Sequence, residues 1–189
     1  MIRIGRPSIS EQRRIEIGRA LQTCMVRNGS YEATTIKEIA QEAGIATGLV
    51  HHFFVSKEEI LMLMADNALL DIANRLEDLL HTSDPAERRE KLAELLGDRA
   101  QDRFIMMLYS MSLSLPEIRD LILSRQHDLE NDLCRRLSRS SRFTGDPKAT
   151  AYELMFLLES AVLQSTLEER SEAEELLARR LAEAFPEGE

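Results

Sequence analysis

Residues 34–54 read TTIKEIAQEAGIATGLVHHFF, the pattern of two short helices joined by a tight turn. Thr35 stands three residues before Glu38, the spacing of a capping box, in which the hydroxyl accepts from the Glu38 amide and the carboxylate reaches back. Small or apolar residues then follow at helical spacing on the inner side: Ile36, Ile39, Ala40 and Ala43. We therefore predict a first helix over residues 36–43.

A second helix is predicted over residues 47–54, after Gly44 closes the first helix in the left-handed conformation. This helix would bury Val50 and either Phe53 or Phe54. Its other side stays mostly small and polar: Thr47, Gly48, Leu49, His51 and His52. Such a side suits the approach to base edges in a major groove, so a helix-turn-helix is indicated. An ordinary helical hairpin, in which Ala and Gly merely allow close packing, is the alternative.

The composition favours an all-α fold. The 189 residues suffice for one or two compact units, and 43% of them are hydrophobic. Helix-forming Leu, Ala, Glu and Arg are frequent, whereas aromatic residues are few and Trp is absent. The five prolines lie near the edges of periodic segments: Pro7, Pro85, Pro116, Pro147 and Pro186. We predict about nine helices from these breaks and periodicities.

Charge is distributed unevenly along the chain. Residues 1–57 carry eight Lys or Arg against five acids, so +3, which leaves −12 for the remainder of a chain whose net charge is −9. A small cationic head on an acidic body is typical of a protein that confines its contact with DNA to the head.

The first residues are predicted to form an extended arm, because Arg3, Gly5, Arg6 and Pro7 do not favour a helix. A basic arm can lie in a minor groove, although a frayed terminus with incidental arginines is an equal alternative. Ser10 is then expected to cap a helix over residues 11–28 that braces the next two helices.

A long helix is predicted to begin at Lys57, because Ser56 and Glu59 have the spacing of a second capping box. Lys57 and the first-turn amides would then face a phosphate. From residue 60 to residue 80 the helix is apolar on more than one face, so it is expected to connect the head to the body.

The N-terminal part of the chain resembles the signature of the TetR family of bacterial transcriptional regulators. The resemblance covers about residues 10–62 and is carried by Thr34, Thr35, Ile36, Ile39, Ala40, Ala43, Gly44, Ile45, Gly48, Val50, His52, Phe54 and Ser56 to Leu61. It implies a three-helix DNA-binding domain, a connecting helix and a larger helical domain, with repression usually relieved by a small ligand. We accordingly expect a DNA-binding domain over residues 1–55 and an effector-binding and dimerisation domain over residues 56–189.

By position, the resemblance implies DNA contacts for Thr35, Thr47, Gly48, His52 and Lys57. Ala46 departs from it, since a Ser or similar cap is usual there, so the second helix is expected to rely on Thr47 or to be weakly capped. His51 also departs, since Tyr is common there, so that a phosphate contact is altered or pH-dependent. The full set of expected DNA-binding residues is Arg6, Thr35, Lys37, Ala46, Thr47, Gly48, His51, His52 and Lys57. The expected partner is double-stranded DNA with a pseudo-palindromic operator; the alternative is a helical dimer whose head binds a protein.

Five further helices are predicted over residues 85–96, 98–113, 117–137, 148–168 and 172–185. Asp84 and Asp146 precede prolines as caps, and Ser171 with Glu174 forms a third capping box. The helix over residues 148–168 is apolar nearly all round, which favours a two-fold dimer over an internal helix of a monomer. The residues expected at the dimer interface are Met155, Leu158, Val162, Leu177 and Leu181.

Flexible methionines and a few aromatic residues predict a ligand cavity between the connecting helix and the two helices that follow Asp98. The candidates are Met62, Met64, Asn67, Phe104, Met107, Tyr109, Met111 and Gln126, with His127 as a second polar possibility. Each could instead be plain core. Their mostly apolar character indicates a hydrophobic or amphipathic effector.

The sequence does not indicate catalytic, metal-binding, redox or membrane-spanning functions. Cys24 and Cys134 belong to no metal-binding or redox motif and are expected to be reduced. The four histidines lack ligand spacing and there is no phosphate-binding glycine-rich loop, so we expect no enzyme, no metal and no cofactor. No apolar run resembles a signal peptide or spans a bilayer, so a cytoplasmic protein without membrane contact is expected.

Overall fold

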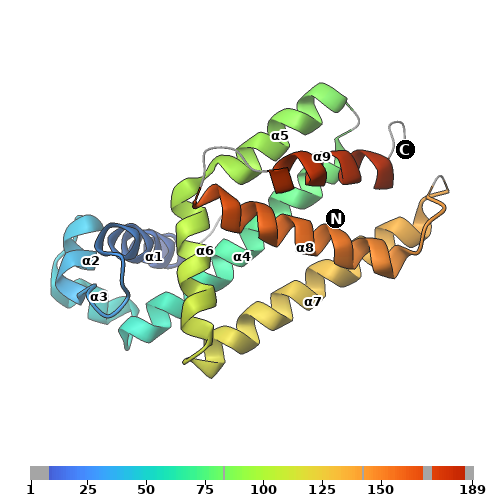
Figure 1. The fold of residues 1–189 in the computed structure, drawn as a ribbon. Coiled ribbons are helices and arrows are strands. Elements are labelled where there is room, and N and C mark those ends of the chain that lie inside the picture. The colour runs from blue at the N-terminus through green and yellow to red at the C-terminus, as the bar shows by residue number, and fades with distance from the viewer. Residues whose placement is uncertain (1–8, 83, 142, 168–171, 186–189) are drawn as a thin grey trace. The chain divides into compact units, whose positions relative to one another are not determined.

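The computed structural model describes residues 9–82, 84–141, 143–167 and 172–185 (Figure 1). These residues form nine α-helices and no strand, so the all-α prediction is confirmed for the described part of the chain. The helices are α1 (Ile9–Asn28), α2 (Ile36–Glu42), α3 (Thr47–Phe53), α4 (Lys57–His81), α5 (Pro85–Gly97), α6 (Arg99–Ser112), α7 (Pro116–Arg139), α8 (Pro147–Ser165) and α9 (Glu172–Ala184).

The chain forms two compact units, Met1–Ala68 and Leu69–Glu189, and α4 contributes its first half to one and its second half to the other. None of the described helices combines the length and the apolarity of a segment that crosses a bilayer.

The first unit is a three-helix arrangement in which α1 packs on α2 and α3 and the start of α4 completes the core. Its central side chains are fully buried: Ile17, Leu21, Met25, Ile39, Val50 and Ile60. Phe54 is the buried member of the Phe53–Phe54 pair, because it follows α3 as the C-cap and points into this core. Gly29 and Gly44 both have positive φ, which lets the chain leave α1 and α2 at sharp angles without a Cβ clash.

Local capping decides where several helices begin. The Thr35–Glu38 capping box before α2 is complete, whereas Ser10 lies inside α1 rather than at its N-cap, because the helix already begins at Ile9. Only half of the second box forms: the Ser56 hydroxyl accepts from the Glu59 amide at 3.2 Å, but the Glu59 carboxylate accepts from the Val55 amide instead. Ser171, the cap of the third predicted box, lies outside the described residues.

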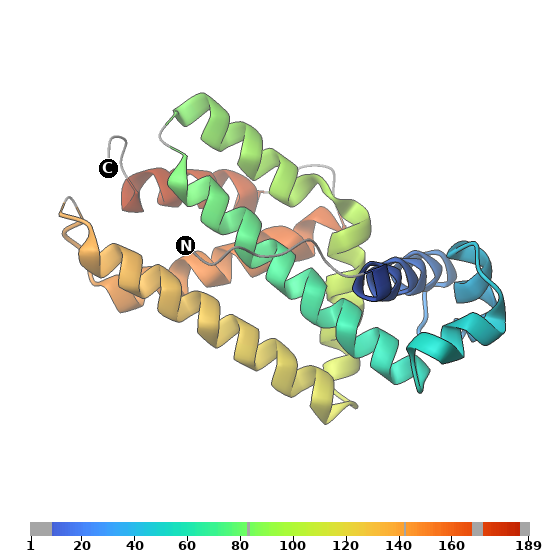
Figure 2. The ribbon, with the colours of Figure 1, turned by 180° about the vertical axis from the view of Figure 1, so that it is seen from behind.

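In the second unit, α8 packs against α5, α6, α7 and α9 (Figures 1 and 2). Asp84, Asp98 and Asp146 cap α5, α6 and α8 through side-chain oxygens, and prolines occupy the first positions of α5 and α8. The core is filled by Phe104, Leu108, Ile118, Leu133 and Leu137, each less than 2% exposed.

Candidate nucleic-acid interface and effector cavity

The small and polar side of α3 faces solvent. Val50, 1% exposed, anchors the helix in the core of the first unit. A Cβ built on Gly48 would meet no atom of the chain within 4 Å, so an outside partner can approach the backbone there. The exposed candidates for DNA contact are Thr35, Lys37, Ala46, Thr47, Gly48, His51 and His52, and all of them belong to the first unit. Arg6 lies outside the described residues.

Helix α3 begins without a side-chain cap. Ala46 has the extended φ and ψ of an N-cap residue, but its methyl group cannot accept a hydrogen bond. The sequence expectation that this helix starts weakly is therefore confirmed at Ala46.

Because only the acceptor is missing at this cap, Ala46→Ser should raise the free energy of unfolding by about 1 kcal/mol. Urea denaturation followed by circular dichroism measures this change. Ala33→Ser is the matched control, since Ala33 is exposed in the loop before α2 and caps no helix; it should leave stability unchanged. Equal effects of the two substitutions would contradict the capping argument.

The C-terminal end of α3 is held by Arg14 of α1, a contact that the sequence did not indicate. The Arg14 guanidinium lies 4.1 Å from the centre of the Phe54 ring, donates to the carbonyl of Phe53, and pairs with the Glu59 carboxylate at 2.8 Å. This hydrogen bond lowers the pKa of Glu59 below its usual range, and the Val55 amide adds to the effect. One cation on α1 thus joins the end of α3 to the start of α4.

Lys57 lies at the start of α4 and points toward the loop between α1 and α2. Its ammonium donates to the carbonyls of Tyr31 and Thr34, each at 2.8 Å, and lies 3.9 Å from the centre of the Tyr31 ring. An ammonium has three donors, and these two carbonyls use two of them. The side chain predicted to touch DNA therefore also holds the loop before α2.

A cavity of about 430 Å³ lies in the second unit, between the second half of α4, α6, α7 and α8. Its walls are mainly aliphatic, including Leu69, Ile72, Leu76, Ile105, Leu129 and Val162. Two of the eight predicted pocket residues line it, Tyr109 and Gln126. Glu159, which the sequence reading missed, lines it beside them.

The other six predicted pocket residues lie elsewhere. Phe104 is fully buried in the core of the second unit, and neither Met107 nor Met111 lines this cavity. Met62, Met64 and Asn67 belong to the first unit, where Met64 packs against Gly18 of α1. Methionine content did not identify the cavity, because flexible methionines fill cores as readily as pockets. His127 is exposed on α7 and does not line the cavity.

The residues predicted for a dimer interface are buried within the chain and need correction. They are between 1% and 9% exposed: Met155, Leu158 and Val162 line the cavity, and Leu177 and Leu181 of α9 are buried in the core of the second unit. Helix α8 instead exposes Tyr152, Phe156 and Leu163. Apolar residues cover nearly all of α8, so periodicity could not tell which side the chain covers itself.

Both cysteines are free; Cys24 is buried and Cys134 half-buried. Burial raises the pKa of the Cys24 thiol, which keeps it protonated and unreactive.

The first unit is similar in sequence to bacterial regulatory proteins. Residues 26–63 match the family model for bacterial regulatory proteins of the tetR family. The chain is 37% identical to the HTH-type transcriptional regulator HbdR of Aromatoleum sp. (strain CIB) over 86 residues, which is 43% of this chain and 36% of HbdR. It is 28% identical to the HTH-type transcriptional regulator BetI of Agrobacterium fabrum over 137 residues, 68% of this chain and 64% of BetI. The matches thus span about a third and somewhat less than two thirds of these relatives.

Solved structures share the fold over most of the chain. A protein from Saccharomonospora viridis, described as a transcriptional regulator and solved in complex with choline, superimposes with a TM-score of 0.68. The superposition covers 90% of this chain and 93% of that protein at 22% sequence identity, so it shows a common fold.

Proposed function

We propose that the chain is a member of the tetR family of bacterial regulatory proteins and acts as a sequence-specific DNA-binding transcriptional regulator. The observation that carries the proposal is the side of α3 that faces solvent, which is small and polar while Val50 anchors the helix. Such a helix can enter a major groove and bring short side chains to base edges.

In this proposal, residues 1–55 form the DNA-binding domain and residues 56–189 form the effector-binding and dimerisation domain. The charge of +3 on residues 1–57 favours phosphate contact there, and the −12 on the remainder disfavours it elsewhere. The regulator works where bacterial DNA lies, in the cytoplasm, and its activity is regulation rather than catalysis.

We infer a homodimer that reads a pseudo-palindromic operator. Tyr152, Phe156 and Leu163 on α8 are 66%, 61% and 43% exposed. An exposed apolar group of this kind on one helix favours burial against a second copy. Two copies would supply two DNA-reading heads for two half-sites.

Release of the operator by a small ligand is the regulation that we propose. The cavity of about 430 Å³ in the second unit has the size and the apolar walls of a ligand site. The Saccharomonospora viridis protein of the same fold was solved in complex with choline. A hydrophobic or amphipathic effector fits these walls.

The test is a footprint of the purified protein on the DNA upstream of its own coding region, with and without candidate ligands. We expect protection of two related half-sites, and an affinity that falls steeply as salt rises because phosphate contacts release counterions. Failure to protect any duplex, or an affinity that ignores salt, would contradict DNA binding and would favour a protein partner for the head.

His52→Ala should weaken binding to the operator about tenfold, the usual scale for one lost base contact, and should affect random duplex less. Fluorescence anisotropy with labelled duplexes measures both affinities. His127→Ala is the matched control, because His127 is exposed on α7 in the second unit. If both variants bind the operator as the parent does, His52 does not read DNA.

A further inference from the structure

The charged groups that line the cavity are mainly carboxylates. Glu77, Asp128, Asp132 and Glu159 line it, with Arg125 as the basic group. Ligand specificity in an apolar cavity depends on whether such groups are already neutralised by the protein.

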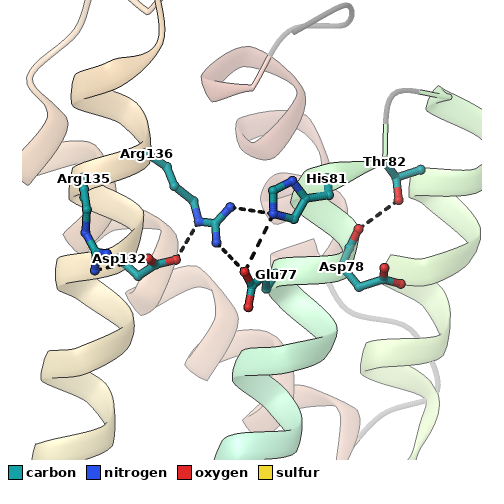
Figure 3. Close-up of polar contacts among 7 residues, drawn as sticks. All are labelled: Glu77, Asp78, His81, Thr82, Asp132, Arg135 and Arg136. Atoms are coloured by element: carbon teal, nitrogen blue, oxygen red, sulfur yellow. Dashed lines mark hydrogen bonds and ion pairs between the residues drawn. The ribbon is translucent and has the colours of Figure 1, made fainter. Parts of the chain in front are cut away.

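Three of the four carboxylates have basic partners. Arg136 of α7 pairs with Asp132 at 2.6 Å and with Glu77 of α4 at 2.8 Å, and its guanidinium also approaches the His81 ring, as Figure 3 shows. Arg125 lies 3.5 Å from Asp128. The Arg136–Glu77 pair joins α7 to α4, and each of these three carboxylates lies beside a guanidinium.

Glu159 differs from the other three. Its carboxylate accepts from the Tyr109 hydroxyl at 3.3 Å and from the Gln126 amide, which also donates to the Tyr109 oxygen at 2.9 Å. Both donors are neutral. Among the residues that the structure describes, no Lys, Arg or His nitrogen forms an ion pair with Glu159.

The surroundings of Glu159 are apolar. It is the one charged residue of the run LMFLLESAVL over residues 154–163 and is itself half-buried. Burial, followed by the negative charge of Glu159, raises the pKa of Tyr109 well above its usual range, so the phenol stays a neutral donor. A carboxylate held by neutral donors beside apolar walls lacks a counter-ion, and a bound cation would supply one.

We propose that the cavity of the second unit takes an organic cation with an apolar body, and that Glu159 is its counter-ion. Tyr109 and Gln126 hold the carboxylate in place, and the Tyr109 ring lies beside it in the cavity lining, where it can contact an alkylammonium group. The aliphatic walls contributed by α4 and α6 cover the apolar body. This inference rests on the proposed function only in taking the cavity as the effector site.

Isothermal titration calorimetry of the full chain with three probes of similar shape tests the proposal. The probes are meta-hydroxyphenyltrimethylammonium, its neutral carbon isostere meta-tert-butylphenol, and the anion para-tert-butylbenzoate. We expect the cation to bind about tenfold more tightly than the neutral isostere, the scale of one charge pair at a half-buried site, and the anion to bind least.

Glu159→Gln should remove the preference for the cation over the neutral isostere. It should weaken binding of the cation about tenfold and leave the affinity for the neutral isostere unchanged. Glu130→Gln is the matched control, since it removes one carboxylate from α7 outside the cavity lining, and it should keep the preference. The comparison of probes on the parent protein needs no variant, so the proposal stays testable if Glu159→Gln does not fold.

Equal binding of the cation and the neutral isostere to the parent protein would overturn the proposal, as would no binding of the cation at about 10 mM. An unchanged preference in Glu159→Gln would also overturn it. Operator affinity, measured on the same preparation, separates the two claims. Operator binding without a cation preference refutes only the cation site, whereas a cation preference without duplex binding refutes only the regulatory function.

Discussion

Asp102→Asn should abolish a loss of about 3 kcal/mol in unfolding free energy that we expect for the parent protein between about pH 4 and pH 7. Asp102 lies on α6, is 2% exposed, and accepts a hydrogen bond from the Ser165 hydroxyl of α8. Burial raises the pKa of its carboxyl from 3.8 to about 6, and the charge of Asp98 adds to the shift. The Ser165 hydrogen bond and the charge of Arg75 oppose it.

The direction of this pH dependence follows from the number of protons bound by the folded and unfolded states. Between the unfolded pKa near 3.8 and the folded pKa of about 6, the folded protein holds a proton that the unfolded chain has released. Stability from this group is therefore complete below the unfolded pKa and is lost as pH rises through the folded pKa. A shift of about two pKa units corresponds to about 3 kcal/mol. Asparagine stays neutral at every pH and lacks this dependence.

Urea denaturation of both proteins at several pH values measures the difference in unfolding free energy between parent and variant, which cancels the other titrating groups. The unfolding free energy of the variant should rise relative to that of the parent as pH rises from about 4 to 7. Asp120→Asn, an exposed substitution on α7, serves as the control and should give a difference that does not change with pH. A difference for Asp102→Asn that is constant with pH would show that its carboxyl ionises as easily folded as unfolded.

Local signals predicted the helices well. The Thr35–Glu38 box, the Asp84 and Asp146 caps and the positive φ of Gly44 depend on neighbours within four residues, so the sequence displays them directly. The exposure of the small, polar residues of α3 also follows from helical periodicity, because Val50 fixes which side is buried.

Contacts between distant residues could not be predicted in this way. The Arg14 contact with Phe54 spans 40 positions and the Glu159 contact with Tyr109 spans 50, so no local pattern records either. A signal for Glu159 was nonetheless present, since it is the single acid in a largely apolar run of ten residues. Burying a carboxylate is costly unless it forms hydrogen bonds or binds a ligand.

Lys57→Met should lower the free energy of unfolding by about 3 kcal/mol, because it removes two charge-assisted hydrogen bonds and a cation–π contact together. The carbonyls of Tyr31 and Thr34 would lose their donor, and these residues are only 8% and 1% exposed. Thermal and urea denaturation measure the loss. We also expect weaker DNA binding, since the loop that these carbonyls belong to leads directly into α2.

Lys37→Met separates the structural role of Lys57 from a phosphate contact. Lys37 is exposed on α2 and its loss removes the same charge, so stability should change by less than about 0.5 kcal/mol. If the third donor of Lys57 meets a phosphate, Lys57→Met should lower the salt dependence of duplex affinity by about one unit of slope. If Lys57 only holds the loop, affinity should fall with an unchanged slope. A stable Lys57→Met protein with full operator affinity would contradict both roles, because neither the loop nor the phosphate would then depend on this ammonium.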